Sequence, residues 1–132
     1  MQITLEADYA IRIVHCLSCR NTRTDAKVVS EITGVTLRFS LKILRKLVAA
    51  GIIISYKGTH GGYEIVKPIE NITLYDVIST IEGPLNISRC VSPEFICTRN
   101  KNGQCQFQRV FMELTEDIKK KLIEINFAQL LD

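Results

Sequence analysis

Apolar residues recur at helical spacing along most of the chain, and this periodicity predicts a largely α-helical protein. The expected helices cover approximately residues 4–20, 26–33, 36–50, 74–82 and 106–124. Asp25 and Thr73 stand where N-caps are expected, because their side-chain oxygens can accept hydrogen bonds from the first free backbone N–H groups of a helix. Gly34 and Gly51 follow helices at positions typical of C-caps.

One segment departs from helical spacing. Residues 52–56 form a β-branched run, residues 57–62 are rich in glycine, and residues 63–66 alternate between apolar and polar side chains. This pattern predicts a β-hairpin. The hairpin follows two helices that are joined by a tight glycine-containing turn, which is the order of a winged helix-turn-helix. The expected fold is therefore mainly α with a small β-hairpin wing, followed by a long C-terminal dimerisation helix.

The helix expected over residues 36–50 has two distinct faces. Leu37, Leu41, Leu44 and Val48 fall on one face, and Arg38, Lys42, Arg45 and Lys46 fall on another. Residues 1–67 carry a net charge of +5, whereas residues 68–132 carry −2, so the basic half suggests an anionic partner such as DNA. The alternative is an ordinary solvated face. The residues expected to contact double-stranded DNA are Thr36, Arg38, Lys42, Arg45 and, in the wing, Lys57, Thr59 and His60, with Arg12 and Arg20 as additional phosphate contacts.

The five cysteines are unevenly distributed. Cys90, Cys97 and Cys105 lie within 16 residues, in a segment without clear periodicity. Thiolates bind iron–sulphur clusters or zinc, and the spacing is wider than that of Cys-x2-Cys zinc sites. A fourth ligand must come from elsewhere, and thiol oxidation is a further alternative. Cys16 and Cys19 are three residues apart on the first expected helix, where core packing is the favoured role for Cys16.

The last expected helix carries an apolar stripe that has no intrachain partner of equal length. A second copy of the chain would bury this stripe, so we expect a homodimer. The residues expected at the dimer interface are Phe107, Phe111, Leu114, Ile118 and Leu122. The chain is thus divided into a DNA-binding domain (1–83), a cysteine-containing loop (84–105) and a dimerisation helix with a C-terminal tail (106–132).

Several classes of protein fit the sequence poorly. No stretch reaches the roughly 20 apolar residues that span a bilayer, and the first residues lack the features of a signal peptide, so we expect a cytoplasmic protein. No nucleophile–base pair, phosphate-binding loop or paired carboxylates indicate an enzyme. The alternative from another class is an iron–sulphur carrier or accessory protein without a role on DNA.

Four segments resemble one known family. They are residues 8–12 (DYAIR), 44–53 (LRKLVAAGII), 57–63 (KGTHGGY) and 72–78 (ITLYDVI) with Glu82-Gly83. With the cysteine-rich loop before a long helix, they resemble the Rrf2 family of winged-helix transcription regulators, which has IscR-, NsrR- and RirA-like members. The resemblance implies a dimeric regulator, expected to be a repressor, whose long helices cross at the interface. It also implies a 2Fe–2S or 4Fe–4S cluster held by Cys90, Cys97 and Cys105.

The resemblance further implies how the ligand set is completed. In NsrR-like members an aspartate near the N-terminus of the partner subunit is the fourth ligand, and Asp8 stands at the matching place. IscR-like members use a histidine three residues after the last cysteine, where this chain has Gln108. The wide cysteine spacing is closer to the iron-regulator pattern. We expect nitric oxide, redox state or iron supply to act through the cluster on DNA affinity.

Overall fold

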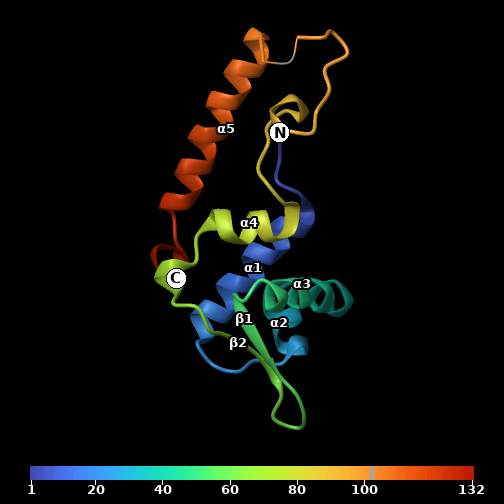
Figure 1. Ribbon diagram of the computed structural model, residues 1–132. Coiled ribbons are helices and arrows are strands. Elements are labelled where there is room, and N and C mark those ends of the chain that lie inside the picture. The colour runs from blue at the N-terminus through green and yellow to red at the C-terminus, as the bar shows by residue number, and fades with distance from the viewer. Residues whose placement is uncertain (102) are drawn as a thin grey trace.

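The computed structural model describes residues 1–101 and 103–132; Asn102, within the expected cysteine loop, lies outside the described residues. The elements are α1 (Leu5–Arg20), α2 (Ala26–Thr33), α3 (Leu37–Ala49), β1 (Ile53–Tyr56), β2 (Gly62–Ile65), η1 (Ile69–Asn71), α4 (Leu74–Glu82), η2 (Arg89–Val91), α5 (Gln106–Glu124) and η3 (Phe127–Leu130). The expected fold class, helices with a single β-hairpin wing, is confirmed (Figure 1).

Polar side chains cap most of the helices and explain where they begin. The Thr4 hydroxyl accepts a hydrogen bond from the Ala7 N–H at 3.1 Å, and the Asp25 carboxylate accepts one from Lys27. Thr36, expected within the third helix, is instead its N-cap, with its hydroxyl accepting from the Phe39 N–H. Gly34 ends α2 in the left-handed conformation that favours glycine.

The core forms where α2, α3 and α4 pack around α1. The face of α3 that packs into this core differs from the apolar face marked out in the sequence. Leu44 is buried as that pattern suggests, but Leu37 is 44% exposed and Ser40 is fully buried. The small Ser40 side chain lies close to the α2–α3 turn, where its hydroxyl donates to the Val35 carbonyl. The buried face of α3 therefore comprises Ser40, Ile43, Leu44 and Leu47.

The wing is tied to the loop between α1 and α2. Strands β1 and β2 pair antiparallel, and Tyr63 makes two further backbone hydrogen bonds with Thr24, at 2.8 and 2.9 Å. Gly62 has φ +144°, and a Cβ there would lie 2.8 Å from the Thr24 carbonyl oxygen. A residue with a side chain would therefore separate the wing from the helical body.

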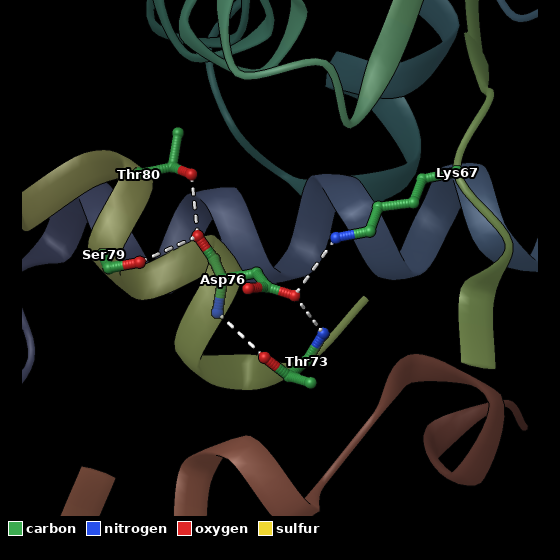
Figure 2. Close-up of polar contacts among 5 residues, drawn as sticks. All are labelled: Lys67, Thr73, Asp76, Ser79 and Thr80. Carbon is green, nitrogen blue, oxygen red and sulfur yellow. Dashed lines mark hydrogen bonds and ion pairs between the residues drawn. The ribbon is translucent and has the colours of Figure 1, made fainter. Parts of the chain in front are cut away.

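The exit from the wing is tied to the start of α4. Thr73 and Asp76 form a capping box, in which each side chain accepts a hydrogen bond from the other residue's backbone N–H (Figure 2). The Asp76 carboxylate also lies 3.6 Å from the Lys67 ammonium, just beyond β2. One carboxylate thus holds both the helix start and the segment that leaves the wing.

Helix α5 extends away from the helical body, and its N-terminal end lies at the opposite end of the molecule from the wing tip (Figure 1). It packs on α4 and η2, while η3, which follows it, returns to the core through the fully buried Phe127. Among the described residues, no helix is both long and apolar enough to span a bilayer.

Candidate functional site

The expected DNA-reading face of α3 is exposed. Arg38, Lys42 and Arg45 all point away from the core and line one hollow of the surface together with Thr36. Lys46, the fourth cation of the predicted face, is instead half-buried, and its ammonium lies 2.7 Å from the Glu6 carboxylate. The basic face available to a partner is therefore narrower than the sequence suggested.

The predicted wing residues lie together at the hairpin tip. Lys57, Thr59 and His60 are all exposed. Sequence reasoning missed Arg23, which fixes this tip: its guanidinium stacks 3.4 Å from the centre of the Tyr56 ring and donates to the His60 carbonyl at 3.2 Å. The tip is therefore anchored to the helical body by a cation–π contact and a hydrogen bond.

Arg12 and Arg20, expected as additional phosphate contacts, both have partners within the chain. Arg12 forms an ion pair with Asp8 at 2.9 Å, and its guanidinium also lies over the Tyr9 ring. Arg20 donates to the Thr24 hydroxyl at 3.1 Å. A phosphate would compete with these contacts.

The three clustered cysteines line one small cavity. Cys90 comes from η2, Cys97 from the following loop and Cys105 from the N-cap of α5, and the cavity between them has a volume of about 30 Å³. This space holds roughly one or two water molecules. The fold therefore brings together three thiols that the sequence separates by six and seven residues.

The chemistry of this donor set suits a metal cluster. Hydrogen bonds from the backbone N–H groups of Lys101 and Arg99 lower the pKa of the Cys97 thiol, and the positive charges of Arg99 and Arg89 lower it further. A lowered pKa favours the thiolate, which is the form that binds metals. Within the described residues, however, no three His, Cys, Asp or Glu side chains converge closely enough to hold a single metal ion.

Gln108 also lines the cysteine cavity and holds its walls together. Its side-chain N–H donates to the Cys90 carbonyl at 2.8 Å, and its side-chain oxygen accepts from the Gly103 N–H at 3.0 Å. In the sequence, Gln108 stands out only as the residue in place of the histidine of IscR-like members. Its position three residues after Cys105, the N-cap of α5, places it next to that cysteine, which is the signal that would have identified it.

Asp8, the expected ligand from a partner subunit, lies on α1 and does not line the cysteine cavity of its own chain. Its carboxylate is partly exposed and paired with Arg12. As expected, Cys16 is buried in the core, and burial raises the pKa of its thiol. Cys19 is exposed, with its sulphur 3.5 Å from the His15 ring nitrogen.

The stripe expected at a dimer interface is partly uncovered along α5. Phe107 is 64% exposed and Leu114 is 43% exposed, while Phe111, Ile118 and Leu122 are half-buried. Such exposure of large apolar side chains along one helix is typical of a surface that another molecule covers.

Comparison with known proteins agrees with this architecture. The family model Rrf2, described as an iron-dependent transcriptional regulator, matches residues 3–132. Protein aau3 of Rhizobium meliloti (strain 1021) is 29% identical over 91 residues, which are 68% of this chain and 59% of that protein. This match thus spans less than two thirds of the relative's length.

Solved structures show the same fold at low identity. IscR of T. potens superimposes with a TM-score of 0.74 at 20% identity, covering 98% of this chain and 85% of that one. CymR, the global cysteine regulator of B. subtilis, gives a TM-score of 0.76 at 20% identity, covering 98% and 95%. The oxidised form of Staphylococcus aureus CymR gives 0.74 at 20% identity, covering 100% and 97%.

Proposed function

The chain belongs to the Rrf2 family of transcriptional regulators, and on that basis we propose that it is a DNA-binding regulator, acting as a repressor, controlled by an iron–sulphur cluster on Cys90, Cys97 and Cys105. The observation that supports the cluster is the convergence of these three thiols on one cavity. Such a donor set, with one thiolate favoured by backbone hydrogen bonds, suits soft metal centres.

The spacing of the cysteines favours a cluster over a single zinc ion, because it is wider than that of Cys-x2-Cys zinc sites. In a 4Fe–4S cluster each protein ligand binds a different iron atom, so the ligands stand further apart than around one zinc ion. When bound, an iron–sulphur cluster supplies a metal centre that responds to oxidants, nitric oxide and iron supply.

Asp8 is the group through which the cysteine loop of one subunit would act on the DNA-reading unit of the other. It lies on α1, which packs directly on α3, the helix that carries Arg38, Lys42 and Arg45. Because α1 and α3 are in direct contact, a shift of α1 toward the partner's cluster would change the position of the recognition helix. Arg12, the present partner of Asp8, contacts one carboxylate oxygen and would compete with an iron atom for this group.

The proposal also needs a homodimer, because Asp8 does not line its own chain's cysteine cavity. The uncovered apolar side chains of α5 support this assembly. In a two-fold dimer, the two recognition helices and wings would contact two half-sites, and their spacing would determine DNA affinity.

The test of the cluster begins with anaerobic purification, visible spectroscopy and counts of iron and sulphide. We expect coloured protein, and loss of colour in Cys97→Ala but not in Cys19→Ala, which removes an exposed thiol outside the cavity. Cluster-loaded and cluster-free protein should then differ in affinity for a duplex selected from a random library. Equal affinity of the two forms would refute control by the cluster.

The DNA-reading residues are tested through the salt dependence of binding. Each phosphate contact removed should reduce the slope of log K against log salt by about 0.9, whereas loss of a base contact relaxes sequence choice. We expect one of these results for Arg38→Ala and for Arg45→Ala. Arg109→Ala, an exposed arginine on α5, is the matched control and should change neither quantity.

A second candidate mechanism is direct thiol oxidation. The lowered pKa of Cys97 favours the reactive thiolate, and this supports a regulator that responds through sulphur chemistry without iron. The same purification distinguishes the two mechanisms. Colourless protein whose DNA affinity changes with hydrogen peroxide, and does not change in Cys97→Ala, would favour oxidation over the cluster.

A further inference from the structure

A cavity of about 510 Å³ lies between α1, α2 and η3, away from both the cysteine loop and the DNA-reading face. Ile11 is half-buried in its apolar lining, and the buried Cys16 and Phe127 lie beneath it. At its edge, Ile32 is 54% exposed and Leu130 is 38% exposed. The volume and apolar lining are those of sites that bind small organic molecules.

The polar groups of this cavity favour a negative charge. Arg12, Arg20 and His15 all line it, and they come from one face of α1. The cavity already receives a carboxylate from the chain itself, because Asp132 Oδ2 lies 3.5 Å from His15 Nε2. That carboxylate is 89% exposed, so a competing anion can displace it with little loss of burial.

We propose that this cavity binds a small organic anion with an apolar body, such as an aromatic or branched carboxylate or sulfonate. The acidic group takes the place of the Asp132 carboxylate beside His15 and the two arginines. The apolar body packs on Ile11, Ile32 and Leu130, which removes exposed apolar surface from water.

Occupancy of the cavity is linked to Asp8 through Arg12. This side chain lines the cavity, pairs with Asp8 at 2.9 Å and donates to the Thr33 carbonyl at 3.5 Å. An anion that draws Arg12 into the cavity weakens its hold on Asp8. This coupling step rests on the proposed function, because it assumes that Asp8 acts as a ligand for the partner's cluster. Binding of an anion to the cavity does not depend on that assumption.

Binding is tested by calorimetry on the full-length protein, with and without its cluster. The probe is 8-anilinonaphthalene-1-sulfonate, an apolar anion, and its neutral counterpart is N-phenyl-1-naphthylamine. We expect one sulfonate site per chain and weaker binding of the neutral probe. Binding of neither probe, or equal affinity for both, would overturn the proposal.

Two variants of one exposed residue locate the probe. Ile32→Asp and Ile32→Lys both remove the same apolar side chain at the cavity edge but add opposite charges. The two variants differ by two units of charge at the cavity edge. We therefore expect their affinities for the sulfonate to differ roughly fivefold to tenfold, with the lysine variant binding more tightly. Equal affinity of the two variants would place the probe elsewhere, for instance on α5, and would also overturn the proposal.

The coupling to Asp8 has a separate readout. We expect saturating sulfonate probe to change the rate at which a chelator removes iron from the cluster-loaded protein, and to leave that rate unchanged in Arg12→Gln. A probe that binds the cavity without altering iron loss would refute the coupling alone. If the protein binds no cluster, the proposed function fails, and calorimetry on the cluster-free protein still decides whether the cavity binds anions.

Discussion

The side chain of Gln108 is expected to control how easily the cysteine loop opens, and Gln108→Ala tests this role. The glutamine joins two parts of the loop to α5, through the Cys90 carbonyl at 2.8 Å and the Gly103 N–H at 3.0 Å. Alanine removes both hydrogen bonds and leaves the helix intact, because alanine is the best helix former.

The magnitude follows from the number and exposure of these bonds. A hydrogen bond contributes about 0.5–1.5 kcal/mol net, so two contribute about 1–3 kcal/mol. Gln108 is only half-buried, and water partly replaces the lost partners, which favours the lower part of this range. A loss of about 1–2 kcal/mol raises the population of the open loop roughly fivefold to thirtyfold.

Hydrogen exchange of the Gly103 amide measures this opening directly, because its N–H is the donor to Gln108. In the cluster-loaded protein, the rate of iron loss to a chelator should rise by a similar factor. Gln106→Ala is the matched control, since Gln106 is an exposed residue of the same type in the same turn of α5. The free energy of global unfolding should be nearly unchanged in both variants.

The reasoning would be refuted by a Gly103 exchange rate that is the same in Gln108→Ala and Gln106→Ala. It would also be refuted by exchange that accelerates equally throughout the chain, because that result would indicate global destabilisation. Faster exchange at Gly103 without faster iron loss would show that Gln108 holds the loop closed but does not control the release of iron.

Three further outcomes are expected. Phe127→Ala should lower the free energy of unfolding by about 3–5 kcal/mol in chemical denaturation, because this fully buried ring packs into the core around α1; a loss below about 1 kcal/mol would contradict that packing. Gly62→Ala should destabilise the wing, since its Cβ would meet the Thr24 carbonyl at 2.8 Å, and limited proteolysis should then cut the hairpin faster than in the parent protein. In cluster-free protein, iodoacetamide labelling of Cys97 should reach half its maximal rate at a pH below the ordinary thiol range. Burial raises the pKa of the Cys16 thiol, so Cys16 should stay unlabelled until higher pH. The reverse order of labelling would refute the stated causes of both pKa shifts.

The predictions that rested on local sequence signals are largely confirmed. Asp25 and Thr73 cap the helices they were expected to cap, and α5 begins and ends where its apolar periodicity predicted. The hairpin also lies where the glycine-rich turn placed it. Caps, turns and helical periodicity depend on neighbours within a few residues, so the sequence carries them directly.

The tertiary structure decided what depends on distant neighbours. Leu37 is exposed and Ser40 buried, because the packing of α3 against other helices selects the face that enters the core. Phe127, which the sequence placed only in a C-terminal tail, is a fully buried core residue.

The same division applies to the candidate sites. The sequence by itself identified three clustered cysteines and a basic helix, because residue type and spacing suffice for both. Only the fold decided that the thiols share one cavity, that Gln108 holds its walls together and that the Glu6 carboxylate forms an ion pair with Lys46. These are contacts between residues far apart in the sequence or across a loop, and their geometry is determined by the packing of the whole chain rather than by local propensity.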